Sequence, residues 1–248
     1  KGVPLLSQNR QFQYFNAATY IYPMVPASAA SYLAANGHTV TWLDGIAEKW
    51  TFDRWLEELR AASPDLLLME TKCPVIKQHW VIARRLREQL PSLLQVWVGD
   101  HVTYLPQETF DQAPIDAIIT GGDYDFLILD LVNHIERGAA LPPGIWFPAD
   151  HSRISAPDAR IERTAAGRML ATTGPPQLTH ALDTLPFIDR ELTRWQLYAY
   201  ENGNYKYTPG TYVYSGRDCW WNKCTFCVWD HTLNPPGSYR SFSPERLF

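Results

Sequence analysis

Two kinds of hydrophobic pattern alternate along the first 140 residues of the chain. Apolar runs or alternating apolar and polar stretches, which are typical of strands, occupy residues 3–7, 39–43, 65–70, 94–98 and 117–120. Segments with helical periodicity or composition occupy residues 27–36, 51–60, 77–90, 107–112 and 126–137. Gly37 and Gly138 follow two of these segments, as expected at helix C-termini. The alternation of strands and helices predicts an α/β fold with a five-stranded parallel sheet of the flavodoxin-like, or Rossmann-like, kind.

The carboxyl ends of the predicted strands are the expected ligand-binding edge, because open parallel sheets bind ligands there. Candidate residues follow three of the strands: Thr71 and Lys72, then Gly99, Asp100, His101 and Thr103, then Gly121, Gly122 and Asp123. The polar and aromatic loop 8–22 is expected at the same edge. Glycines at such positions allow the backbone to approach a flat ligand closely. Cys73 also follows a predicted strand, and we interpret it as a buried, inert thiol.

Residues 141–186 break this pattern, because they are rich in proline and contain few long apolar runs. We expect them to form a linker, with a small hairpin at residues 144–147 and 153–155. A second predicted domain then leads through the strand-like run 211–214 to a loop that contains cysteines. The predicted division is therefore a first domain of residues 1–140, the linker, and a second domain of residues 187–248.

Three of the four cysteines, Cys219, Cys224 and Cys227, lie within nine residues in the spacing C-x4-C-x2-C. Thiolates this close in sequence favour a single metal centre. In a cubane 4Fe–4S cluster, three protein thiolates leave one iron open to a substrate or cofactor. A zinc site with His231 as fourth ligand is the alternative, although zinc motifs usually come as two separated pairs. A disulfide is disfavoured, because nothing marks the chain as secreted.

Composition and charge argue against several classes of protein. The net charge of −4 and the lack of a basic block disfavour nucleic-acid binding. The sequence has no run of eighteen apolar residues and does not open on a signal peptide, so we expect a cytoplasmic protein that does not bind a membrane. The chain begins with Lys1 and ends in Ser-Pro-Glu-Arg-Leu-Phe, a pattern typical of the start of a helix. Further sequence is therefore expected beyond both ends.

The order of these parts resembles the cobalamin-binding branch of the radical S-adenosylmethionine enzymes along essentially the whole chain. The cysteine loop is similar to the C-x3-C-x2-C motif of that family, with one extra residue between the first two cysteines and with Phe226 as the aromatic residue before the third. Other short segments match the family in the same order. They are Ser31 to His38 with Leu43 and Asp44, Gly99 to Thr103 (family pattern G-G-x-H-x-T), Gly121 to Tyr124 (family pattern G-E-G-E), and Tyr239 and Arg240 with Ser243 to Glu245.

The resemblance implies three cofactors: a 4Fe–4S cluster on Cys219, Cys224 and Cys227, S-adenosylmethionine beside Phe226, and cobalamin at the sheet edge. The implied cobalamin-binding residues are Thr71, Gly99, Asp100, His101, Thr103, Gly121, Gly122 and Asp123. The sequence lacks the D-x-H-x-x-G motif of many cobalamin carriers, whose histidine ligates cobalt. His101 is therefore either a replacement ligand or, as we favour, a histidine that hydrogen-bonds within the rim of the site.

The activity that the resemblance favours is methyl transfer to an unactivated carbon or phosphorus centre of a small-molecule or peptide substrate. A radical derived from S-adenosylmethionine would take a hydrogen atom from the substrate, and methylcobalamin would donate the methyl group. Oxidative cyclisation or ring rearrangement is the alternative within the family, and a non-catalytic corrinoid-binding or zinc-binding module is the alternative outside it. An electron donor such as flavodoxin or ferredoxin is the implied partner. A radical S-adenosylmethionine barrel needs more strand–helix units than follow the cysteine loop, so we expect this stretch alone to be inactive.

Overall fold

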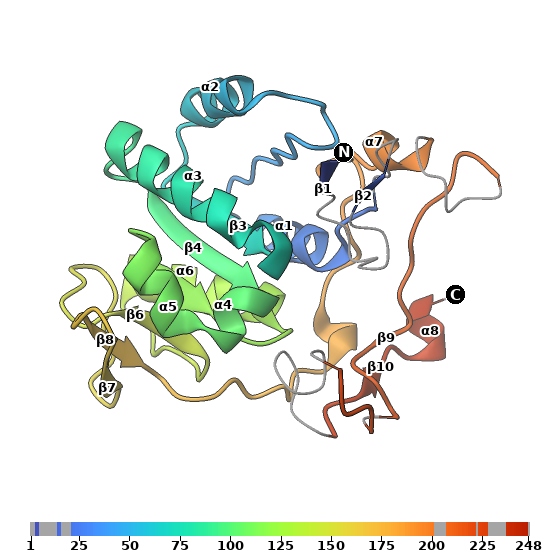
Figure 1. The fold of residues 1–248 in the computed structure, drawn as a ribbon. Coiled ribbons are helices and arrows are strands. Elements are labelled where there is room, and N and C mark those ends of the chain that lie inside the picture. Colours follow the sequence, from blue (N-terminus) through green and yellow to red (C-terminus); the bar gives the residue numbers. More distant parts are fainter. Residues whose placement is uncertain are drawn as a thin grey trace. The chain divides into compact units, whose positions relative to one another are not determined.

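A computed structural model of the chain describes residues 3–4, 14–15, 21–200, 207–221, 223–227 and 237–247. The chain divides into two compact units, and each contains two separate stretches of the sequence (Figure 1). The first unit comprises Lys1–Pro64 and Leu185–Ser215, and the second comprises Asp65–Thr184 and Gly216–Phe248. Within the described ranges, no helix is long and apolar enough to cross a membrane.

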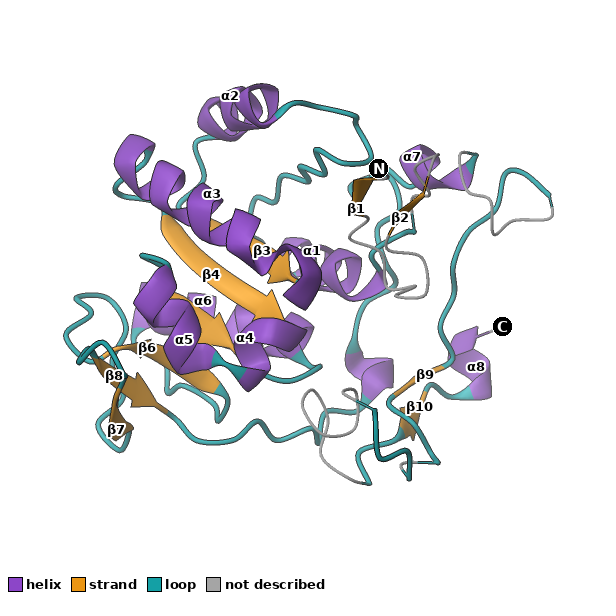
Figure 2. Ribbon diagram, in the orientation of Figure 1, coloured by secondary structure: helices purple, strands orange, loops and turns teal. Residues whose placement is uncertain are grey.

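The second unit is built on a six-stranded mixed sheet (Figure 2). Its strands, in spatial order, are β3 (Leu66–Thr71), β4 (Leu94–Gly99), β5 (Ala117–Ile119), β6 (Ile145–Pro148), β8 (Met169–Thr172) and β7 (Arg160–Arg163). The first three strands are parallel to one another. In contrast, β6 is antiparallel to β5, and β8 is antiparallel to both β6 and β7.

Helices cover both faces of this sheet (Figure 1). The helices of the second unit are η1 (Cys73–Val75), α3 (Ile76–Gln89), α4 (Asp100–Tyr104), α5 (Pro106–Gln112), α6 (Tyr124–Arg137), η2 (Leu182–Thr184) and α8 (Pro244–Leu247). Figure 1 shows α3, α4 and α5 on one face of the sheet and α6 on the other. A short antiparallel ladder of β9 (Gly216–Arg217) and β10 (Arg240–Ser241) also belongs to this unit.

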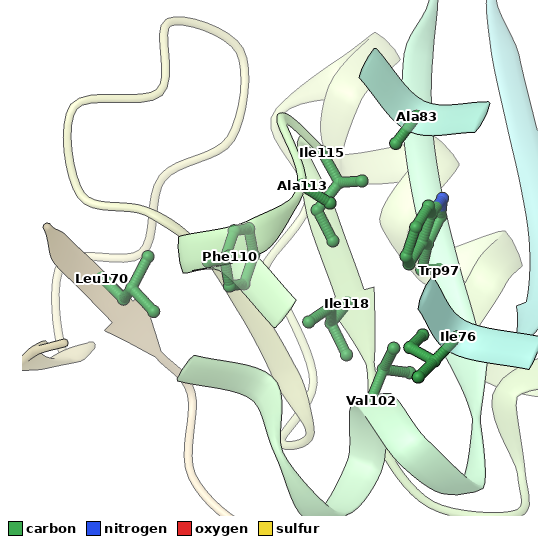
Figure 3. Packing of buried hydrophobic residues seen from close by; sticks show 9 residues of the cluster. All are labelled: Ile76, Ala83, Trp97, Val102, Phe110, Ala113, Ile115, Ile118 and Leu170. Atoms are coloured by element: carbon green, nitrogen blue, oxygen red, sulfur yellow. The ribbon is translucent and has the colours of Figure 1, made fainter. Parts of the chain in front are cut away.

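A hydrophobic core lies between the sheet and the helices α3, α4 and α5 (Figure 3). It contains Ile76, Ala83, Trp97, Val102, Phe110, Ala113, Ile115, Ile118 and Leu170. Figure 3 shows Trp97 of β4 beside Ala83 and Ile76 of α3, and Phe110 of α5 facing Leu170 of β8. All residues of β4 are buried, which explains why the sequence of this strand is almost continuously apolar.

The first unit contains β1 (Val3–Pro4), β2 (Tyr14–Phe15), α1 (Met24–Ala35), α2 (Phe52–Ala62) and α7 (Gln196–Ala199). Its hydrophobic core combines Tyr22, Met24, Ala27, Ala47 and Tyr198. The Tyr198 hydroxyl donates a 2.5 Å hydrogen bond to Asp44, and the Tyr22 hydroxyl is hydrogen-bonded to Thr193. The stretch 185–215 is therefore joined to the N-terminal stretch by buried contacts within this unit.

The predicted helices are all confirmed, because α1, α2, α3, α5 and α6 match the expected segments. The strands β3, β4 and β5 are also confirmed, but the sheet differs from the five parallel strands that we expected. Residues 39–43 show the predicted alternation of exposure and yet belong to no strand among the described residues. Residues 3–7 were expected to form the first strand of the parallel sheet, but Val3–Pro4 pairs with Tyr14–Phe15 in a separate antiparallel ladder. Alternation reports a half-buried extended segment and does not specify a partner for its backbone.

The stretch 141–186, which we expected to be a linker, supplies β6, β7 and β8 of the sheet. The expected hairpin of residues 144–147 with 153–155 is replaced by pairing of β6 with β8. The only proline within these strands is Pro148, the last residue of β6, so the prolines interrupt little of the ladder. The assignment of residues 1–140 to a cobalamin-binding domain and of residues 187–248 to the start of a barrel stays a prediction.

Gly99, at the end of β4, provides a test of this packing. Its φ is +111°, and a Cβ there would lie 2.2 Å from the carbonyl oxygen of Thr71. Gly174 has a similar φ of +96°, but among the described residues no atom lies within 4 Å of its Cβ position. We predict that Gly99→Ala lowers the free energy of unfolding by about 3 kcal/mol, and Gly174→Ala by about 1 kcal/mol. Urea unfolding followed by circular dichroism measures both, and equal losses would contradict the close approach of Thr71.

Candidate functional site

The carboxyl ends of β3, β4 and β5 lie at one edge of the sheet, which we call the rim. Its residues are Thr71, Gly99, Asp100, His101, Thr103, Gly121, Gly122 and Asp123. Thr71 lies opposite Gly99 in the β3–β4 register, and its hydroxyl donates a 2.9 Å hydrogen bond to the Val98 carbonyl. The Thr103 hydroxyl donates to the Gly99 carbonyl at 2.7 Å and accepts from the Gly121 N–H at 3.1 Å. The predicted convergence of the three loops after β3, β4 and β5 at one sheet edge is therefore confirmed. Most of the loop 8–22, which was expected at the same edge, lies outside the described residues.

Asp100 and His101 are both buried at the start of α4. One carboxylate oxygen of Asp100 accepts hydrogen bonds from the backbone N–H groups of His101 (2.7 Å) and Cys73 (3.3 Å). His101 Nε2 lies 3.2 Å from a carboxylate oxygen of Glu108, and the His101 ring packs edge-on against Trp80. Within the described part of the chain, His101 Nε2 has no hydrogen-bond partner. The interpretation of His101 as a histidine that hydrogen-bonds within the rim therefore stays a prediction. Cys73 is exposed, so the prediction of a buried thiol was wrong, because Cys73 begins the turn η1 and does not continue the strand.

Glu70 precedes the rim and connects two neighbouring segments. Its carboxylate accepts hydrogen bonds from Lys72 Nζ and from the Tyr124 hydroxyl, both at 3.1 Å. Burial raises the pKa of Tyr124 well above its ordinary value, and the negative charges of Glu70 and Asp125 raise it further. Tyr124 therefore remains a hydrogen-bond donor to Glu70 at neutral pH.

The loop after β5 leads into a buried group of charges, which we call the charge cluster: Asp123, Asp125, His180, Arg217 and Arg240. The side chains of Asp123 and Asp125 are fully buried. Arg217 of β9 donates to the two oxygens of Asp125 at 2.8 and 2.5 Å and to Asp123 at 3.1 Å. Arg240 of β10 donates to both oxygens of Asp123, at 2.6 and 2.8 Å. His180 Nδ1 lies 3.1 Å from Asp123.

The charge cluster keeps the Asp123 carboxylate ionised. Burial alone would raise the pKa of Asp123, but hydrogen bonds from His180 and Arg240 and the charges of Arg240 and Arg217 outweigh burial. The pKa of Asp123 therefore lies well below its ordinary value. Because both of its oxygens accept from arginine, Asp123 acts as a counter-ion within the protein.

The cysteine loop, residues 218–239, begins and ends at the β9–β10 ladder. In this ladder Gly216 pairs with Ser241, and Arg217 pairs with Arg240. A Cβ on Gly216 would lie 2.5 Å from the Arg240 carbonyl oxygen, so glycine allows the strands to come this close. Cys219 follows Arg217 by two residues. The first candidate metal ligand therefore lies directly after a residue of the charge cluster.

The three clustered cysteines have the chemistry that an iron–sulfur cluster requires, although they do not form a finished site. Cys219, Cys224 and Cys227 are half-buried, and within the described part of the chain none of them is in a disulfide. No three Cys, His, Asp or Glu side chains among the described residues converge closely enough to hold a metal ion. Phe226 is 85% exposed, and His231 lies outside the described residues.

Four residues of the charge cluster were not predicted as site residues from the sequence: Asp125, His180, Arg217 and Arg240. Arg240 was noted only as part of a segment that resembles the family. Asp125 carried a signal, because it is an acidic residue beside the apolar run 126–129. Arg217 carried another, because it lies directly before the cysteine motif. Neither signal identifies a partner, since the bonds from Arg217 and Arg240 to Asp123 and Asp125 join residues 92 to 117 positions apart.

Comparison with known proteins identifies distant relatives. No protein-family model matches the chain. The anaerobic magnesium-protoporphyrin IX monomethyl ester cyclase of Rubrivivax gelatinosus is 26% identical over 212 residues, which are 83% of this chain and 34% of the cyclase. An uncharacterized methyltransferase of Pyrococcus horikoshii is 23% identical over 228 residues, which are 90% of this chain and 44% of the relative. The chain thus spans less than half the length of the curated relatives that it matches.

Two solved structures are also similar, and both are of the radical S-adenosylmethionine methyltransferase TsrM of Kitasatospora setae. The structure with tryptophan and an S-adenosylmethionine analogue bound has a TM-score of 0.48 at 19% identity, over 57% of this chain and 28% of TsrM. The structure with cobalamin and a [4Fe-4S] cluster bound has a TM-score of 0.45 at 19% identity, over 60% of this chain and 27% of TsrM.

The charge cluster predicts a specific pH dependence of stability. The pKa of Asp123 in the folded chain lies below its unfolded value of about 3.9, so its stabilising contribution is complete above about pH 5. It is lost progressively as the pH falls from the unfolded pKa towards the lower folded pKa. Between pH 6 and pH 3, the wild type should lose about 1 kcal/mol more than Asp123→Asn. Urea titrations at each pH measure this difference, with Asp158→Asn at an exposed position as the charge control. Identical pH profiles of the wild type and Asp123→Asn would contradict a buried, ionised carboxylate.

Proposed function

We propose that the second unit assembles cofactors for a cobalamin-dependent radical S-adenosylmethionine enzyme. The observation that carries this proposal is the attachment of the three-cysteine loop, through buried ion pairs, to a loop at the carboxyl end of a parallel strand. Such a sheet edge suits a flat corrin, and three thiolates suit a 4Fe–4S cluster with one open iron. The similarity to a cyclase and to a methyltransferase along most of the chain supports the same class of enzyme.

In this proposal the cysteine loop holds the cluster. Cys219, Cys224 and Cys227 supply the thiolates, and Phe226 packs beside S-adenosylmethionine. Phe226 and Trp220 are largely exposed, so the loop offers apolar surface to a bound cofactor. The cofactors supply the radical and methyl chemistry, while the residues of the chain bind them, orient them and exclude water.

The rim is proposed to hold cobalamin, through Thr71, Gly99, Asp100, His101, Thr103, Gly121, Gly122 and Asp123. The polar groups of Thr71, Asp100 and Thr103 already hydrogen-bond within the protein, so their role is to shape the edge. Gly121 allows the backbone to approach a corrin closely, because it carries no side chain. Glycine at position 99 is required by the close approach of the Thr71 backbone.

The proposed reaction is methyl transfer to an unactivated carbon or phosphorus centre of a small-molecule or peptide substrate. The enzyme would act in the cytoplasm and take electrons from a flavodoxin or ferredoxin. Oxidative ring closure is the second candidate, and the similarity to the Rubrivivax gelatinosus cyclase favours it. A zinc-binding module without catalytic activity would differ from both in its metal content.

Anaerobic reconstitution tests the proposed cluster. We expect the wild-type chain to bind about four iron atoms and to show the charge-transfer absorption of a cubane. Cys224→Ala should lose both signals, whereas Cys73→Ala, which changes a cysteine outside the loop, should keep them. Metal analysis and visible spectroscopy measure the result. Zinc without iron, or cubane absorption that survives in Cys224→Ala, would contradict the proposal.

The choice between the two reactions is tested on the full-length protein with S-adenosylmethionine labelled in its methyl group. Methyl transfer predicts that the label enters the product. Ring closure predicts an unlabelled product, and magnesium-protoporphyrin IX monomethyl ester, named in the relative, is the probe for that activity. Mass spectrometry of the products distinguishes the outcomes, and an unlabelled cyclised product would replace methyl transfer with ring closure.

A further inference from the structure

Arg217 and Arg240 lie directly opposite each other in the β9–β10 ladder. Like charges at directly opposite positions of two strands repel each other. Both side chains are largely removed from water, with exposed fractions of 7% and 17%, so solvent screens this repulsion poorly. The Asp123 carboxylate offsets the repulsion, because it accepts hydrogen bonds from Arg217 at 3.1 Å and from Arg240 at 2.6 and 2.8 Å.

The two neighbouring acidic residues make different contacts. Asp125 binds Arg217 at 2.8 and 2.5 Å and so contacts one end of the cysteine loop. Asp123 binds both arginines and so contacts both ends of the loop. It also follows Gly121 and Gly122 in the rim. A single carboxylate therefore connects the rim to both strands from which the cysteine loop extends.

We propose that Asp123 is a positioning residue whose charge holds the two ends of the cysteine loop together and against the rim. The part of this inference that concerns the cluster rests on the proposed function, whereas the part that concerns the ladder does not. Direct contact between Asp123 and a cofactor is not required, because arginine N–H groups already occupy both of its oxygens.

The repulsion between the arginines leads to a specific second-site prediction. Asp123→Asn leaves Arg217 paired with Asp125, and leaves Arg240 with Asp218, whose carboxylate lies 3.7 Å away. No carboxylate is then shared by the two arginines, and the ladder opens. Adding Arg240→Gln to Asp123→Asn removes one of the two like charges, so the ladder is partly restored. If Asp123 only added stability through packing, the two substitutions would instead add their losses.

Hydrogen exchange of the metal-free chain measures the ladder directly. In peptides that cover residues 216–217 and 240–241, Asp123→Asn should exchange at least tenfold faster than the wild type. The double variant should recover at least half of that change on a logarithmic scale. Asp158→Asn is the charge control, and exchange in β4 reports whether the fold is intact. A double variant that exchanges faster than Asp123→Asn, or a ladder in Asp123→Asn as protected as in the wild type, overturns the proposal.

Arg240→Gln alone keeps the test decisive if Asp123→Asn also loses protection in β4. This variant leaves Asp123 paired with Arg217 and His180. The side chain at position 240 is also closer to solvent than that of Arg217, so the fold should tolerate the substitution. It should exchange about threefold faster in the ladder than Asp158→Asn, with β4 unchanged. Ladder exchange equal to that of Asp158→Asn would overturn the role of the ion bridge.

Retention of the cluster tests the positioning role. After anaerobic reconstitution, iron release to a chelator is followed through the decay of the cubane absorption. Asp123→Asn should lose iron about tenfold faster than the wild type, and Arg240→Gln in that background should slow the loss. If the wild type binds no cluster, the proposed function is refuted. The exchange experiment then still tests whether Asp123 holds β9 and β10 together. Equal rates of iron loss despite an open ladder would overturn the positioning role alone.

Discussion

The attachment of the cysteine loop depends on one carboxylate buried between two guanidinium groups. Removing ions from water costs several kcal/mol each, and only well-aligned, charge-assisted hydrogen bonds compensate for it. Arg240 meets both oxygens of Asp123, and Arg217 meets both oxygens of Asp125. Removing one partner of such a buried pair costs about 3–5 kcal/mol, whereas an exposed pair, such as those on α2, contributes about 0–1 kcal/mol. The loss of a single partner should therefore disturb the attachment of β9 and β10 far more than the loss of an exposed pair would disturb α2.

The rim is held together in another way, by short hydrogen bonds between side chains and backbone. Thr71 and Thr103 bind neighbouring carbonyl groups, and Asp100 binds two backbone N–H groups. These polar groups are thus used inside the protein, and the close approach of Gly99 to Thr71 leaves no space for a side chain between β3 and β4. In contrast, the two ends of the cysteine loop pair in the β9–β10 ladder, and within its described part the three thiols do not converge closely enough to hold a metal ion.

Much of the second unit could be predicted from the sequence, for identifiable physical reasons. Burial on both faces leaves β4 almost continuously apolar, so its sequence indicates a strand without reference to any other segment. The cysteine motif lies within nine consecutive residues, so it too is recognised without reference to any other segment. In contrast, β7 is mostly exposed and β6 lies among prolines, so their short sequences resemble a linker. The bond between Asp123 and Arg240 spans 117 positions, and a single sequence contains no signal that pairs them.

The direction of β6 determines where the rim ends. Because β3, β4 and β5 are parallel, their carboxyl ends share one edge, whereas β6 is antiparallel to β5 and presents its amino end there. Thr120, directly after β5, binds the carbonyl of Gly144, directly before β6, through its N–H and its hydroxyl, both at 2.8 Å. This contact closes the rim on one side and limits it to the three loops that follow parallel strands. Asp123 lies in the loop next to that contact. The antiparallel direction of β6 therefore places the carboxylate that anchors the cysteine loop at the border of the rim. Our sequence prediction missed this change of strand direction.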